Sequence, residues 1–176
     1  MSRSITPCSA PVKAAFEEVV QETAPHWGID GCSAPNFACS VAGLARAMQF
    51  SPPPIQMAPP ARPPPPRLTR AMAAFPELVA GERLHRVDGG LQGPRRRVKT
   101  GAEAVFIAII PEQKRGIALK IVDGGTRAAE AAIAALLVRC GLLQRADPAV
   151  EKRLPSVQTN WCGRVTGEMR LAPGFG

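Results

Sequence analysis

Two short stretches of the sequence hold most of the side chains that could do chemistry. In the first, Gly28–Asn36, a carboxylate, a thiol and a hydroxyl follow one another as Asp30, Cys32 and Ser33. The glycines of this stretch permit unusual backbone angles, and its proline stiffens the exit. A loop of this composition either places side chains at a site or makes a simple turn, and spacing alone leaves both interpretations open.

The second stretch is Arg95–Gly101, which ends in Lys99, Thr100 and Gly101. As charge, it is a basic patch suited to phosphate, but no aromatic platform accompanies it, so nucleic acid is a disfavoured partner. As a motif, it is K-T-G at the end of a predicted strand, as in serine β-lactamases and penicillin-binding proteins. A fixed cation and a hydroxyl at a sheet edge suit an anionic group of a substrate.

The mechanism to which K-T-G belongs also needs S-x-x-K, in which a lysine one helical turn after a serine accepts its proton. No serine or cysteine of this sequence has a lysine three residues later. We therefore expect the remaining groups to supply no activated nucleophile.

Metal-binding patterns are sparse. The sequence has no C-x-x-C pair, and Cys32 and Cys39 are too far apart in sequence to form one. Cys32, in its glycine-flanked loop, is the best candidate for a metal ligand.

Composition limits the class of protein. The chain has 176 residues, 22 Lys+Arg against 14 Asp+Glu, a net charge of +8 and five cysteines, too few for a disulfide scaffold. It holds no apolar run long enough to cross a membrane, and its start does not resemble a secretion signal. We expect a cytoplasmic protein with no membrane partner.

Hydrophobic periodicity predicts the elements that must position these residues. It favours helices over 12–21, 41–49, 68–75 and 127–140, the last with Thr126 as its N-cap. It favours a short extended segment over 96–100, an antiparallel hairpin of 104–110 and 116–122, and a strand over 161–170. Helices packed on an antiparallel sheet make an α+β fold.

A proline-rich run, 52–66, separates these regions and should be neither helix nor central strand. It is either a solvated linker or insertion, or a ligand for an aromatic-lined groove. The second interpretation rests on two P-x-x-P patterns, Pro60–Pro63 and Pro63–Pro66.

Longer motifs make the sequence recognisable. WGIDGCSAPNFA at 27–38 resembles the signature loop of the L-asparaginase II family of the Rhizobium type, the thermolabile "type 3" asparaginases. The likeness continues at 42–48 and 70–84, runs almost without interruption over 98–137, and ends with NWCGRVTGEMR at 160–170.

This resemblance implies hydrolysis of L-asparagine to L-aspartate and ammonia, on a β-lactamase/transpeptidase-like fold and usually in a homodimer. It implies a lysine-activated serine and a zinc ion held partly by cysteine, which places Cys32 at a ligand position. It further implies that Lys99 and Asp30 belong to the catalytic site. Lys99, Thr100 and Gly101 would bind the substrate carboxylate, and Asp30 would orient the substrate amine or a ligand.

The sequence departs from the family in its first residues, in the proline-rich run and in the missing S-x-x-K. We expect a truncated chain that corresponds to the C-terminal half of such an enzyme, with an incomplete fold and no activity alone. Its predicted divisions are a divergent segment 1–10, an asparaginase-like part 11–51, a proline-rich insertion or linker 52–67, an asparaginase-like part 68–170, and a tail 171–176. The alternative is a non-catalytic remnant that acts as a proline-rich interaction protein.

Overall fold

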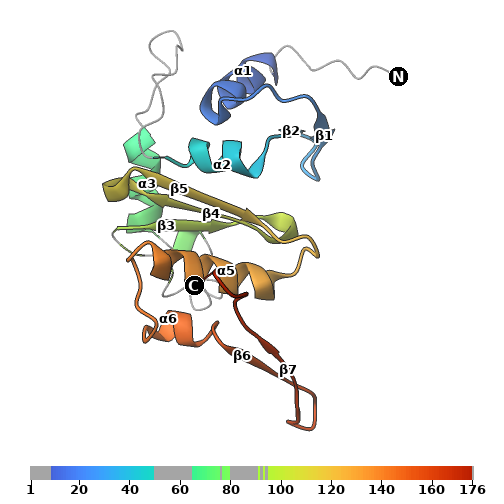
Figure 1. The fold of residues 1–176 in the computed structure, drawn as a ribbon. Coiled ribbons are helices and arrows are strands. Elements are labelled where there is room, and N and C mark those ends of the chain that lie inside the picture. Colours follow the sequence, from blue (N-terminus) through green and yellow to red (C-terminus); the bar gives the residue numbers. More distant parts are fainter. Residues whose placement is uncertain are drawn as a thin grey trace.

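The centre of the molecule is a three-stranded antiparallel sheet (Figure 1). A computed structural model describes residues 9–49, 65–75, 77–79, 91, 93 and 95–175 of the chain. The divergent start (1–8) and most of the proline-rich run (52–64), including Pro60–Pro63, lie outside the described residues. The predicted divisions of the chain and the groove-ligand interpretation therefore stay predictions.

The sheet contains β3 (Arg97–Thr100), β4 (Val105–Ile110) and β5 (Arg115–Lys120), in the order β3-β4-β5. In β4 alternate side chains are buried, as the pleat of a strand requires, beginning with Phe106. The turn η2 (Pro111–Gln113) joins β4 to β5. The predicted hairpin is confirmed within a residue or two at each end.

One face of the sheet is covered by α5 (Thr126–Arg139), the predicted Ala/Leu-rich helix. The core between them contains residues from both elements: Val98, Phe106, Ala108, Leu119, Ala129, Ile133, Ala134 and Leu137. The predicted N-cap was wrong by one residue. Gly125 is the cap, Thr126 already has helical geometry, and the Asp123 carboxylate accepts a hydrogen bond from the Gly125 N–H at 2.7 Å.

The other face carries α1 (Ser9–Val20) and α2 (Val41–Ala47), which lie above the sheet in Figure 1, opposite α5. Helix α2 packs directly on β5 at Gly116. An ideal Cβ at residue 116 would lie 2.7 Å from the carbonyl carbon of Met48, closer than real Cβ atoms approach. The absence of a side chain therefore lets the helix and the strand meet backbone to backbone.

Glu22 ties the end of α1 to the start of α2. Its carboxylate accepts hydrogen bonds from the Ser40 backbone N–H at 3.0 Å and hydroxyl at 2.6 Å, and it pairs with Arg46. The Ser40 hydroxyl in turn caps α2 by accepting from the Gly43 N–H at 2.9 Å. This network fixes where the chain between the two helices can run.

Helix α3 (Pro65–Ala74) lies beside β3, and Arg97 Nε donates to the Thr69 carbonyl at 3.1 Å. The expectation that the whole run 52–66 avoids helix was wrong at its end, because α3 begins at Pro65. Proline is tolerated in the first turn, where its missing N–H would have no helical partner.

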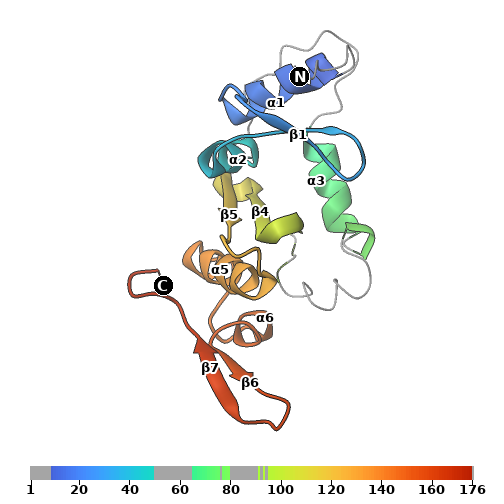
Figure 2. The same ribbon diagram turned by 90° about the vertical axis from the view of Figure 1, so that its right-hand side faces the viewer.

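The last part of the chain holds α6 (Pro148–Glu151) and a separate antiparallel hairpin of β6 (Ser156–Thr159) and β7 (Val165–Met169). This hairpin projects away from the sheet in both ribbon views (Figures 1 and 2). The predicted strand 161–170 was wrong in its first four residues, which form the turn of the hairpin. Its partner β6 was not predicted.

The fold is α+β, as predicted, with small antiparallel sheets and helices on both faces of the central one.

An ion pair joins the region of α6 to α5. The side chain of Arg153, just after α6, is only 3% exposed and pairs with Glu130 of α5 at 3.5 Å. In the described part of the chain, no helix has both the length and the apolar character that crossing a membrane requires.

Candidate functional site

The Asp30–Cys32 loop is the turn of a short hairpin between β1 (Trp27–Ile29) and β2 (Pro35–Phe37). The backbone closes the turn with a hydrogen bond from the Asp30 N–H to the Ala34 carbonyl at 2.9 Å. Sequence analysis predicted a loop over the whole region and missed the two three-residue strands. Such short strands carry too few residues to show an alternating pattern.

The Asp30 carboxylate organises this turn. One oxygen accepts from the Gly31 N–H at 2.8 Å, and the other accepts from the Cys32 thiol at 3.8 Å. Both side chains are exposed to solvent. The structure therefore brings the predicted carboxylate and thiol together at an accessible tip.

The hairpin is anchored at its other end. Phe37 is buried and its ring centroid lies 5.8 Å from that of Phe16 in α1. The Ala38 N–H donates to the His26 carbonyl at 2.9 Å. Above this anchor, a hollow of about 370 Å³ lies against the hairpin, with Asp30 and Asn36 among its lining residues.

The K-T-G residues close strand β3. Val98 is buried against α5, and because successive side chains of a strand alternate, Lys99 lies on the opposite face of the sheet. Lys99 Nζ donates to the Thr100 carbonyl at 2.5 Å, and Thr100 Oγ1 donates to the Gly101 carbonyl at 3.4 Å. The ammonium and the hydroxyl are thus held at the end of β3 by local bonds.

A left-handed turn follows the motif and fixes its position. In the 3-10 turn η1 (Ala102–Ala104), Glu103 and Ala104 have φ of 54° and 55°, which few non-glycine residues adopt. Lys120 Nζ donates to the Glu103 carbonyl, and the Ile121 N–H donates to the Ala104 carbonyl at 3.2 Å. Sequence analysis did not predict this turn or the roles of Glu103 and Lys120, because no residue type in the turn indicates a positive φ.

The two groups of predicted residues lie on separate elements. Asp30 and Cys32 are at the hairpin tip, whereas Lys99, Thr100 and Gly101 end β3; the tip and η1 face the same side of the molecule (Figures 1 and 2). The hydrogen bonds of these side chains within the described residues are all local. The structure therefore brings together the residues within each group. Among the described residues, no hydrogen bond or ion pair links Asp30 or Cys32 to the K-T-G residues.

The arginines before K-T-G form structural hydrogen bonds and ion pairs. Arg95 pairs with Glu112, and Arg96 donates to the carbonyls of Leu91 at 2.7 Å and Leu142 at 3.0 Å. Burial lowers the pKa of the Arg96 guanidinium from its ordinary value. These contacts account for much of the basic patch as structural bonding between β3, η2 and the loop after α5.

Zinc would need more donors than the described residues bring together. Asp30 and Cys32 could provide two, but among the described residues no group of three or more His, Cys, Asp or Glu is placed to hold a metal ion. A zinc ion in a protein takes three or four side-chain ligands. The described residues therefore do not by themselves fit zinc, and Cys32 as a ligand stays a prediction.

Comparison with known proteins bears on the whole chain. No curated protein sequence matches it. The profile of a protein family described as L-asparaginase II matches residues 3–171, which span the hairpin loop, the K-T-G strand and the β6–β7 hairpin. A match over nearly the entire chain means that this protein belongs to the L-asparaginase II family.

Proposed function

We propose that this chain contributes the substrate-carboxylate side of a site that hydrolyses L-asparagine to L-aspartate and ammonia. The observation that carries the proposal is the position of Lys99. It is the next-to-last residue of strand β3, on the face of the sheet that carries α2, and the β1–β2 hairpin tip faces the same side as the end of the strand. Membership of the L-asparaginase II family supports asparagine as the substrate class.

The end of β3 suits the carboxylate of an amino acid. The Lys99 ammonium and the Thr100 hydroxyl now bond to neighbouring carbonyls, and a substrate carboxylate can take their place as the acceptor. Gly101 fits closely beside Val105, since an added Cβ would lie 3.3 Å from the Val105 Cβ.

Asp30 takes the complementary role in this proposal. Its exposed carboxylate orients the substrate ammonium, while the Cys32 thiol that donates to it holds its orientation. In the hydrolysis itself, a nucleophilic hydroxyl adds to the side-chain amide carbon, its proton passes to the amide nitrogen, and the C–N bond breaks to release ammonia. Water then hydrolyses the ester that remains, which gives L-aspartate and restores the hydroxyl. Since no serine of this sequence precedes a lysine by three residues, that hydroxyl comes from outside it.

The remaining expectations from the resemblance belong to the same proposal. A β-lactamase/transpeptidase-like sheet is supported by the antiparallel order β3-β4-β5 with helices on both faces. A homodimer and zinc ligation by Cys32 are carried over from the resemblance, and we derive no step of the reaction from zinc. A cytoplasmic location is carried over from the composition of the sequence.

The first test is ammonia release from L-asparagine by the purified chain, with zinc added, beside L-aspartate binding followed by NMR. We expect no ammonia from the chain alone. We also expect weak binding of L-aspartate that Lys99→Ala reduces about tenfold, the usual effect of removing one charged hydrogen-bond donor. Adding a polypeptide with the S-x-x-K part of an L-asparaginase II should then start ammonia release.

Lys152→Ala is the matched control, because Lys152 is an exposed lysine at the end of α6, outside the candidate site. It should bind L-aspartate as the unmodified chain does. If Lys99→Ala binds L-aspartate unchanged, the assigned role of Lys99 is wrong. Ammonia release by the chain alone, lost in Lys99→Ala, would show that the site is complete and that the S-x-x-K reasoning is wrong.

A further inference from the structure

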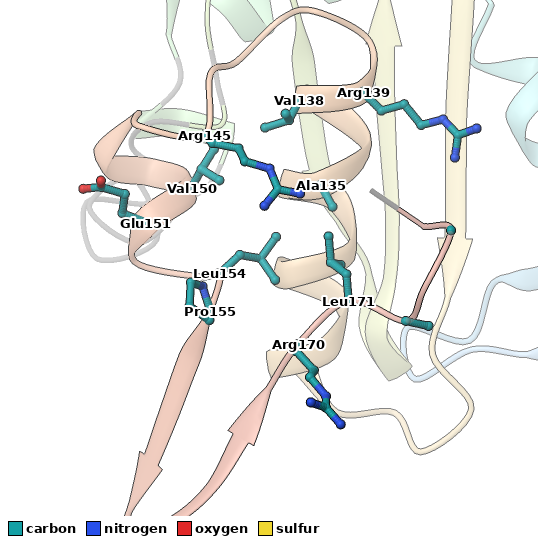
Figure 3. A pocket seen from close by; sticks show the side chains of 12 residues that line it. Ala135, Val138, Arg139, Arg145, Val150, Glu151, Leu154, Pro155, Arg170 and Leu171 are labelled. Atoms are coloured by element: carbon teal, nitrogen blue, oxygen red, sulfur yellow. The ribbon is translucent and has the colours of Figure 1, made fainter.

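A cavity of about 640 Å³ lies on the far side of α5 from the candidate site. It is lined by α5, α6, the loop that joins them, the two residues before β6 and the segment that follows β7 (Figure 3). It shares no lining residue with the β1–β2 hairpin hollow or with K-T-G. Its volume is within the range of roughly 300–1,000 Å³ that small-molecule sites occupy.

The floor of this cavity is apolar. Ala135 of α5 and Val150 of α6 are buried, and Leu154 and Leu171 are half-buried around them. An aliphatic or aromatic body placed on these side chains would remove apolar surface from water, which favours binding.

The rim of the cavity is cationic. Arg139, Arg145 and Arg170 line it, against the single carboxylate of Glu151. Figure 3 shows the Arg145 guanidinium pointing in among the lining residues, whereas the Glu151 carboxylate points outwards. The side chains of the three arginines have no ion pair or hydrogen bond in the described part of the chain, unlike Arg95, Arg96 and Arg97.

We propose that this cavity binds a small amphipathic anion, with a carboxylate or phosphate head on Arg145 and an apolar body on the α5–α6 floor. Guanidinium groups bind both heads through paired N–H donors. The guanidinium groups of Arg139 and Arg170 point away from the centre of the cavity in Figure 3, so they contribute only a longer-range positive field. An uncharged apolar ligand would cover Arg145 without giving its donors an acceptor, which costs free energy.

The test is calorimetric titration of the full chain with octyl phosphate, nonanoate and 1-octanol, which share an eight-carbon alkyl body and differ in the head. We expect one molecule of an anion to bind per chain, and 1-octanol to bind at least about tenfold more weakly. The stronger of the two anions identifies the ligand as a phosphate ester or a carboxylic acid. Raising the salt concentration should weaken binding of the anions and leave 1-octanol unchanged.

The decisive variant is Arg145→Gln, which should weaken anion binding about tenfold. Arg164→Gln is its control, because Arg164 is an exposed arginine in the turn of the β6–β7 hairpin, outside the cavity. Arg170→Gln provides a second, independent loss of charge at the rim. Circular dichroism of each variant shows whether it keeps the fold.

Three outcomes would overturn the proposal. The first is no binding by either anion, and the second is equal affinity for 1-octanol. The third is sedimentation showing self-association that Arg145→Gln removes, since the cavity would then receive a second copy of this chain. Anion binding that both arginine variants weaken and that Arg164→Gln leaves intact would support it, whether or not the chain takes part in asparagine hydrolysis.

Discussion

Lys99 and Thr100 have the same local arrangement, in which each side chain donates to a carbonyl of the next residue. From the sequence alone, these residues could be predicted to bind an anion, because the K-T-G motif needs only a strand to position its side chains. The turn that follows them could not be predicted. The left-handed backbone of Glu103 and Ala104 is held by hydrogen bonds that Lys120 and Ile121 donate from elsewhere in the sequence. A local motif can be recognised in the sequence, whereas a strained backbone conformation that a neighbouring strand stabilises cannot.

Glu22 makes the stability of the chain depend on pH. Hydrogen bonds from Ser40, together with Arg46, lower the pKa of the Glu22 carboxyl below its ordinary value. Because this pKa is lower in the folded state, the contribution is complete above the unfolded pKa and is lost as the pH falls through the folded one. We expect Glu22→Gln to lower the melting temperature at pH 7 and to differ less from the unmodified chain below about pH 4.

Melting curves at several pH values test this, with Glu168→Gln as the control. Glu168 is an exposed carboxylate in β7 whose side chain has no ion pair within the described residues. Its variant should melt with the unmodified chain at every pH. A gap between Glu22→Gln and the unmodified chain that stays constant with pH would contradict the assignment.

At the scale of elements, long periodic segments were predicted well, and the four-residue strand β3 was predicted within one residue, but the other short strands were missed. Helix α5 and the β4–β5 hairpin follow their hydrophobic patterns within two residues. The strands β1, β2 and β6 have three or four residues each, and pairing rather than pattern defines them. A short strand is stabilised by its partner strand and by contacts with other elements, which its own residues do not indicate.

The contact of α2 with β5 depends on the missing side chain at residue 116. Since backbone atoms of Met48 and Gln49 occupy the position of a Cβ, Gly116→Ala must push the helix off the strand. We expect a loss of about 2–3 kcal/mol in the free energy of unfolding, the usual cost of overpacking. Urea unfolding measures this loss.

Gly28→Ala is the matched substitution, because nothing lies within 4 Å of a Cβ at residue 28 and its φ is not left-handed. It should change the free energy of unfolding by less than about 0.5 kcal/mol. Equal losses in the two variants would mean that alanine itself, and not the contact with α2, is responsible.

At the scale of the whole molecule, stability is distributed unevenly. The β4 strand lies between two others and contributes to the buried core, whereas among the described strands β6 and β7 pair only with each other. Their hairpin exposes Val157 and Val165, and Trp161 in its turn is fully exposed. Two-stranded hairpins are marginal in water, so this part should open most readily.

Hydrogen exchange followed by mass spectrometry tests that expectation. Peptides from β6–β7 should exchange at least about a hundredfold faster than peptides from β4, as expected for local rather than global opening. Similar protection of both hairpins would contradict it and would indicate that something covers the exposed side chains in solution.

The composition and the motifs predicted an α+β protein of the L-asparaginase II family, which the structure and the family match confirm. They could not predict that the β1–β2 hairpin tip and the end of β3 face one side. That arrangement depends on the Glu22 network and on the contact at Gly116, which join residues far apart in the sequence.

Among the strands that the structure describes, β3 is an outer strand of its sheet, with β4 on one side only. Outer strands offer their free backbone groups to strands of other molecules, and charged side chains on them discourage such pairing. Arg97 and Lys99 both lie on β3. Lys99, to which we assign the substrate carboxylate by proposal, thus also discourages such pairing, so selection for solubility alone would favour a cation at residue 99.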